Sequence, residues 1–116
     1  MSELNNTAFE QAVIGGLLID SELLADVRGL VTSADFHDVV CRLAFETMCK
    51  LSDQNQPVDF MLVADELEKV APRGSWLVDL ATLQRNTPST ANLEAYTQQV
   101  AEYSTLRKMH DAGQDR

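Results

Sequence analysis

The chain lacks the features that several protein classes require. It has no apolar run approaching the roughly 20 residues of a membrane-spanning helix, and residues 2–6 are polar without the basic region of a signal peptide. These absences predict a soluble, cytoplasmic protein that does not enter a membrane. Only 3 prolines and 5 glycines occur among the 116 residues, which indicates short loops within one domain.

Positive charge is also scarce. The chain has 9 Lys and Arg residues against 18 Asp and Glu residues, and its net charge is −9. The basic residues are scattered along the chain rather than clustered. Because clustered Lys and Arg supply most of the affinity for phosphates, we expect no direct binding to nucleic acid, whether by a helix-turn-helix or otherwise. An acidic surface instead favours a basic protein partner.

Cysteine usage excludes a disulfide framework. The two cysteines, Cys41 and Cys49, are 8 residues apart in one helical pattern. On a helix this separation corresponds to a rise of about 12 Å, which is beyond the reach of a disulfide. We therefore expect two reduced and mostly buried thiols.

Helical periodicity covers most of the chain, and no segment alternates as a strand does. Thr7 with Glu10 has the form of a capping box, Asp20 and Asp59 are expected N-caps, and Thr87 or Ser89 is expected to cap the last helix with Pro88 in its first turn. The strongest pattern covers residues 40–51, which should form the central helix.

These patterns predict an all-α fold, a small orthogonal or irregular bundle of five to seven helices. Residues 7–111 should form the helical domain, with a flexible N-terminus at 1–6 and a frayed C-terminus at 112–116. The expected core residues are Val13, Leu17, Leu43, Met48, Leu67, Leu80 and Tyr96.

Two glycines interrupt the first helix. Each of Gly15 and Gly16 costs about 1 kcal/mol of helix propensity, which close packing of another helix would explain. They lack the Lys-Ser/Thr of a phosphate-binding P-loop, so we expect no nucleotide site here.

No catalytic, cofactor or metal site is expected in this chain. His37 stands near Asp35 and Asp38, but the group lacks the defined spacing of metal motifs, and a solvated or locally hydrogen-bonded histidine is favoured. The acidic residues at 65, 66 and 68 are typical of a solvated helix face, with a docking surface as the alternative. A small acid/base enzyme would need carboxylates in an apolar cleft, which nothing indicates.

The end of the last helix has an apolar stripe that runs past the domain. Tyr103, Leu106 and Met109 are either core residues or, as a stripe of this kind often is, a surface for another chain.

Four motifs occur in order along residues 8–108. Residues 10–20 read Glu-Gln-Ala-Val-Ile-Gly-Gly-Leu-Leu-Ile-Asp, residues 35–37 read Asp-Phe-His, residues 56–59 read Gln-Pro-Val-Asp before Asp-Glu-Leu at 65–67, and residues 86–96 contain Asn-Thr-Pro-Ser, then Ala-Asn, then Tyr. In order and spacing they resemble the N-terminal domain of DnaB-type replicative DNA helicases.

This resemblance implies an interaction and assembly module rather than a motor. In the family, these domains form a collar that stabilises the hexameric ring and receives the C-terminal domain of primase. The implied partners are further helicase domains, primase and a second copy, the last bound weakly without the full helical hairpin that follows in the family. ATP and Mg²⁺ belong to a separate RecA-like domain of a parent 5'-3' helicase, so this chain is not expected to be an enzyme.

The chain departs from the family pattern at two places. Where members often have Gly-Gly-x-x-Tyr-Leu, the residues from Gly74 to Leu80 place Trp76 or Asp79 at the tyrosine, in a region linked to primase contact. His37 replaces the tyrosine of Asp-Phe-Tyr. The alternative is a free-standing phage or plasmid protein of the same fold that binds a host helicase or primase.

Overall fold

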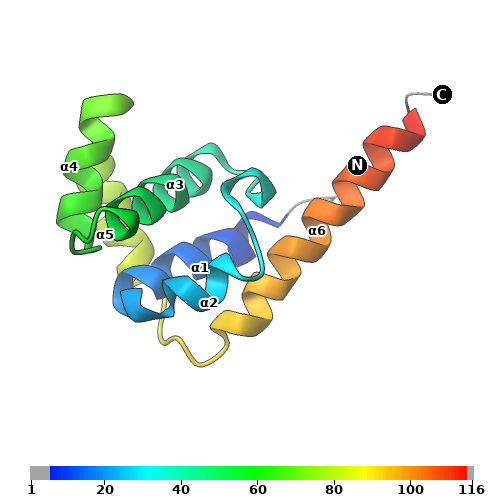
Figure 1. Ribbon diagram of the computed structural model, residues 1–116, viewed down its shortest axis with the longest axis horizontal. Coiled ribbons are helices and arrows are strands. Elements are labelled where there is room, and N and C mark those ends of the chain that lie inside the picture. The colour runs from blue at the N-terminus through cyan, green and yellow to red at the C-terminus, as the bar shows by residue number, and fades with distance from the viewer. Residues whose placement is uncertain (1–5, 115–116) are drawn as a thin grey trace.

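The computed structural model describes residues 6–114, and this part of the chain contains helices and no strands (Figure 1). The α-helices are α1 (Thr7–Ile19), α2 (Leu24–Arg28), α3 (Val39–Asp53), α4 (Phe60–Val70), α5 (Trp76–Arg85) and α6 (Leu93–Gln114). Two short 3-10 segments, η1 (Ser21–Leu23) and η2 (Ser33–Asp35), precede α2 and α3. The prediction of an all-α bundle is confirmed.

Helix α1 occupies the centre of the bundle. It packs against α3, α5 and α6, while α4 packs against α3 and α5. In Figure 1, α4 and α5 lie at one end and α6 runs out from the other, and the molecule measures 44 × 31 × 26 Å. The sequence placed the central helix at residues 40–51, within α3. The centre is α1 instead, because its residues 13–18 are buried in succession, and a helix that is apolar all round is enclosed.

Close packing at the two glycines of α1 is confirmed. A Cβ added to Gly15 would lie 2.6 Å from the carbonyl oxygen of Leu83 and would also meet the side chain of Thr87. A Cβ added to Gly16 would lie 3.0 Å from Leu93 Cδ1. The absent side chains therefore let α1 touch the end of α5 on one side and the start of α6 on the other.

The capping box predicted at the start of α1 is wrong. The N-cap is Asn6, whose side chain accepts hydrogen bonds from the backbone N–H groups of Ala8 and Phe9 at 3.0 and 3.4 Å. The Glu10 carboxylate is 1% exposed and accepts the N–H groups of His37 and Asp38 at 2.9 and 2.8 Å. Glu10 therefore joins α1 to the segment before α3.

The other predicted caps have mixed outcomes. Asp59 caps α4, accepting the N–H of Leu62 at 2.8 Å, as expected. Asp20 caps η1, which leads directly into α2. The expected cap of the last helix is wrong, because α6 begins only at Leu93 and the Thr87 hydroxyl donates instead to the carbonyl oxygen of Leu83 at 2.9 Å. Thr87 precedes a proline, which disfavours helical geometry there, so the motif ends α5.

Most of the predicted core is confirmed. Val13, Leu17, Met48, Leu67 and Leu80 are fully buried. Leu43 and Tyr96 are only half-buried and pack against the core from its edge. Leu43 misses the centre because the buried face of α3 follows Cys41, Ala44, Phe45 and Met48.

The thiols and the chain ends complete the fold. Cys41 is buried, Cys49 is half-buried and both are free, as expected. Burial raises the pKa of the Cys41 thiol far above its ordinary value, with help from the nearby Asp38. Helix α6 continues to Gln114, past the predicted limit at 111. The sequence predicts a flexible N-terminus and a frayed C-terminus. Residues 1–5 and 115–116 of these ends lie outside the described residues.

Candidate functional site

The second half of α6 forms a projecting arm. The residues of α6 that are buried in the domain end at Ser104, and Figure 1 shows the last turns of the helix extending away from the other helices. Within this arm, Leu106 is 39% exposed and Met109 is 65% exposed. Exposed apolar side chains on a free helix end are suited to contact with another chain.

The three residues of the predicted stripe do not share one environment. Tyr103 is half-buried, and its ring centroid lies 6.4 Å from that of Phe9, which also contacts Tyr96 at 5.7 Å. Each three-residue step rotates the side chain by about 60° around a helix of 3.6 residues per turn, so the stripe winds away from the domain. Tyr103 therefore belongs to an aromatic contact between α1 and α6, and only Leu106 and Met109 are presented to solvent.

Asp35 of η2 holds the base of the arm. Its carboxylate accepts the Ser104 hydroxyl at 2.6 Å and lies 3.5 Å from Lys108 Nζ, and its carbonyl oxygen accepts Arg107 at 2.8 Å. Burial alone would raise the pKa of Asp35. The hydrogen bonds from Ser104 and the Thr32 N–H, together with the charge of Lys108, outweigh it and lower that pKa below its ordinary value. This cluster sets the direction in which α6 leaves the domain.

Trp76, whose position the resemblance links to primase contact, is a core residue and is not presented to a partner. It is fully buried, and its indole N–H donates to the carbonyl oxygen of Ala71 at 2.7 Å. The cause is Glu68, whose carboxylate accepts the backbone N–H groups of Arg73, Gly74 and Trp76 at 2.9, 3.0 and 3.2 Å. These bonds fold the loop before α5 so that the helix begins with Trp76 facing inward.

Asp79 lies on the partly exposed side of α5. It accepts the Ser75 hydroxyl at 3.0 Å and pairs with Arg73 at 3.1 Å. Leu77 and Val78, which precede it, are exposed apolar residues. No sequence motif marks these two residues as exposed. Their exposure follows from the burial of Trp76, because the next two residues of a helix are rotated away from the side that faces the core. Together, Leu77, Val78 and Asp79 form the α5 surface.

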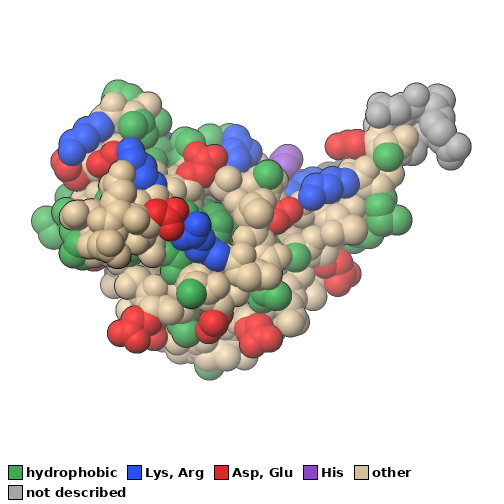
Figure 2. Space-filling view, in the orientation of Figure 1, with side chains coloured by type: hydrophobic (Ala, Val, Ile, Leu, Met, Phe, Trp, Pro, Cys, Tyr) green, Lys and Arg blue, Asp and Glu red, His purple; other side chains and the backbone are tan. Residues whose placement is uncertain are grey.

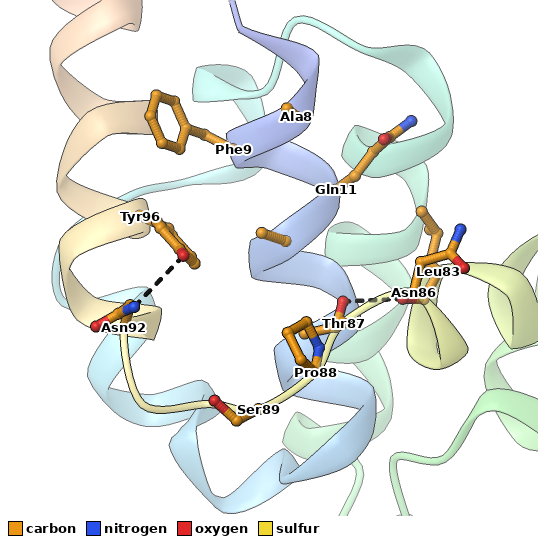
Figure 3. A pocket seen from close by; sticks show the side chains of 11 residues that line it. Ala8, Phe9, Gln11, Leu83, Asn86, Thr87, Pro88, Ser89, Asn92 and Tyr96 are labelled. Atoms are coloured by element: carbon orange, nitrogen blue, oxygen red, sulfur yellow. Dashed lines mark hydrogen bonds between the residues drawn. The ribbon is translucent and has the colours of Figure 1, made fainter.

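A depression lies at the loop between α5 and α6. The pocket there has a volume of about 350 Å³. Figure 3 shows α1, the end of α5, this loop and the beginning of α6 around it, with Phe9 and Tyr96 on one side and Thr87 and Pro88 on another. Asn92 donates to the Tyr96 hydroxyl at 3.5 Å. None of the lining residues is charged, so the pocket offers no group for acid/base chemistry at neutral pH.

Metal-binding geometry is also absent from residues 6–114. That range holds no group of three or more His, Cys, Asp or Glu residues arranged to bind a metal ion. His37 is exposed and donates its backbone N–H to Glu10. Among the described helices, none combines the length and hydropathy needed to span a membrane.

The sequence matches one family over most of its length. The family model described as the DnaB-like helicase N terminal domain matches residues 2–102. The replicative DNA helicase DnaB of Leifsonia xyli subsp. xyli is 32% identical over 106 residues, which are 90% of this chain and 23% of that protein. The enzyme of the same name from Mycobacterium leprae is 32% identical over 108 residues, 91% of this chain and 18% of that protein. The chain thus spans a quarter or less of these relatives.

Solved structures agree in fold. The N-terminal domain of DnaB helicase from Mycobacterium tuberculosis superposes with a TM-score of 0.89 at 29% identity, covering 96% of this chain and 78% of that one. The N-terminal domain of DnaB helicase from Helicobacter pylori, described together with its interactions with primase, superposes with a TM-score of 0.81 at 22% identity, covering 92% and 85%.

Proposed function

Because the chain belongs to the family of DnaB-like helicase N-terminal domains, we propose that it is a protein-interaction and assembly module of a replicative DNA helicase. In this role it is part of the N-terminal collar, stabilises the ring and offers a docking surface to primase. The observation that carries the proposal is the agreement of sequence and fold over nearly the whole chain. Its relatives from Leifsonia xyli and Mycobacterium leprae are replicative helicases, which favours this role over that of a free-standing protein.

On this proposal, the chain is not the ATPase domain that drives the helicase. None of the 116 residues forms a P-loop motif, and we assign ATP and Mg²⁺ to the separate ATPase domain of a parent helicase that acts on DNA in the cytoplasm. On this proposal, the purified chain does not hydrolyse ATP and does not bind DNA directly, in keeping with its net charge of −9.

The arm and the α5 surface have different proposed roles. Leu106 and Met109 serve self-association, since both are exposed and the end of α6 that carries them extends away from the other helices. Because two side chains cover little area, an interface through the arm alone falls below the roughly 1,200 Å² of stable complexes, and association should be weak. The α5 surface, at the place where the family resemblance implies primase contact, serves primase. The Helicobacter pylori domain is described together with its interactions with primase, which supports primase as a partner of this chain.

Sedimentation and binding measurements test the proposal. Sedimentation velocity of the chain over micromolar to millimolar concentrations should show a weak dimer, and Leu106→Asp should weaken it. The matched control is Met61→Asp, because Met61 is similarly exposed at 62% but lies on α4. Both variants should keep the helical circular dichroism signal of the parent.

The binding measurement uses the purified C-terminal domain of a primase from the same source as the chain. It should bind the immobilised chain, and Val78→Asp should reduce that binding while Leu106→Asp affects it less. A chain that stays monomeric at millimolar concentration and also binds neither primase nor other helicase domains would remove the proposal.

A further inference from the structure

A groove separates α2 from the beginning of α6. It has a volume of about 530 Å³ and is lined by Leu23, Asp26, Val27, Leu30, Thr90, Ala91, Leu93 and Glu94. It shares no residue with the arm or the α5 surface, so binding in the groove is independent of the proposed function.

The floor of the groove is apolar and firmly supported. Val27 and Leu93 are buried there, Leu23 is half-buried, and Leu30 remains 41% exposed at the side. Leu93 rests on α1 at Gly16. Because the floor is packed against the central helix, the groove is present before any partner arrives, which lowers the entropic cost of binding.

The rim of the groove is acidic. Asp26 comes from α2 and Glu94 from the first turn of α6, and both are exposed. The nearest cation along α2, Arg28, points its guanidinium at Asp53 of α3 at 2.8 Å. Figure 2 shows acidic side chains next to hydrophobic ones along the lower edge of the molecule, beneath α1, α2 and the start of α6.

An apolar floor between two carboxylates selects one kind of occupant. We infer that the groove binds a basic amphipathic helix of a partner protein, with an apolar side chain on Val27 and Leu93 and a Lys or Arg facing each of Asp26 and Glu94. Helices bind grooves through such apolar anchors, and complementary charge orients them. A second copy of this chain is disfavoured because it carries a net charge of −9. Nucleic acids and anionic lipids are disfavoured for the same reason.

A synthetic peptide is a direct probe of this groove. The probe is a helical peptide of about four turns with Leu along one face and Lys and Arg on both flanks. Its binding to the isotopically labelled 116-residue chain is followed by fluorescence anisotropy and by amide chemical shifts. The shifts should concentrate in residues 23–30 and 90–94, and binding should weaken as salt is raised.

Matched variants separate the groove from general acidity. Asp26→Asn with Glu94→Gln should weaken binding by a factor of about 5–10, which is about 1–1.4 kcal/mol. Glu102→Gln with Asp111→Asn removes the same charge from exposed sites elsewhere on α6 and should leave the affinity nearly unchanged. Leu30→Ser should also weaken binding, with the melting temperature close to that of the parent because Leu30 is exposed.

A second peptide tests the apolar part of the inference. Replacing the Leu residues of the peptide by Ser keeps its charge and should abolish most of the binding. Equal binding of both peptides, equal loss in the two double variants, or shifts that fall outside the groove would each overturn the inference.

Discussion

Replacing Gly15 by alanine places a methyl group between α1 and the end of α5. Its Cβ would lie 2.6 Å from the Leu83 carbonyl oxygen, a backbone atom that cannot rotate away, and against the Thr87 side chain. Overpacking of this kind costs about 1–3 kcal/mol. Disturbing the hydrogen bond from Thr87 to Leu83 costs a further ~0.5–1.5 kcal/mol. Against these stands a helix-propensity gain of about 1 kcal/mol, so the net loss should be about 0.5–3.5 kcal/mol.

Gly16→Ala is the matched control for this substitution. The three atoms nearest to its Cβ would all belong to the side chain of Leu93, with Cδ1 at 3.0 Å, and a terminal methyl group can shift. The same gain in propensity then offsets most of the cost, and the change should stay within about 1 kcal/mol. Urea unfolding followed by circular dichroism measures the free energy of unfolding of both variants. In a thermal melt, each kcal/mol lost should lower the melting temperature by roughly 4 °C.

The order of the two variants is the decisive result. If Gly15→Ala is as stable as the parent, or if Gly16→Ala loses more, the packing argument fails. Adding Thr87→Ala to Gly15→Ala removes the hydroxyl but leaves the Leu83 carbonyl in place, so rescue should be partial. Complete rescue would mean that the side chain, not the backbone, opposes a larger residue at position 15.

Two further predictions concern the core and the base of the arm. Leu80→Ala should lower the free energy of unfolding by about 2–5 kcal/mol, as for other buried leucines. Leu43→Ala should lower it by only about 1–2 kcal/mol, because Leu43 is half-buried. The reverse order in urea unfolding would contradict the burial of these two side chains. Since the pKa of Asp35 is lower when folded than when unfolded, its ionised form stabilises the domain above the unfolded value of about 3.9, and this stability is lost as pH falls through the folded pKa. Asp35→Asn should therefore be less stable than the parent at pH 7 and lose less stability on acidification. If the urea midpoints of variant and parent fell by the same amount as the pH is lowered, this prediction would be refuted.

Local features of the fold are predictable from the sequence, and distant ones are not. The Asp59 cap joins residues 59 and 62, so its spacing is visible in the chain. Glu10 has the right spacing for a capping box, but its carboxylate bonds to His37 and Asp38. Both uses satisfy backbone N–H groups, and only the tertiary arrangement decides between them. Periodicity identified the helices, but not that α1 would be their centre.

The surfaces were harder to predict than the core. The resemblance places Trp76 or Asp79 at the family's tyrosine, in a region linked to primase contact, but the structure has Trp76 buried in the core. Its direction depends on the loop held by Glu68, which is outside the helix that Trp76 begins. The exposure of Leu77 and Val78 follows from that same direction. The acidic groove is not predictable from the sequence, because it lies between α2 and residues 90–94, segments far apart in the chain.

The contact between Gly15 and Thr87 explains why the motifs identify a family without marking a binding site. Gly15 belongs to the Gly-Gly motif and Thr87 to the Asn-Thr-Pro-Ser motif, and in the structure they are two sides of one contact. A side chain at residue 15 would have no room, and Thr87 there binds the last turn of α5. Each motif is thus required by packing against the other. Leu106, Val78 and the rim of the groove are exposed and meet no such requirement within the domain; on the proposals made above, what they must fit is a partner.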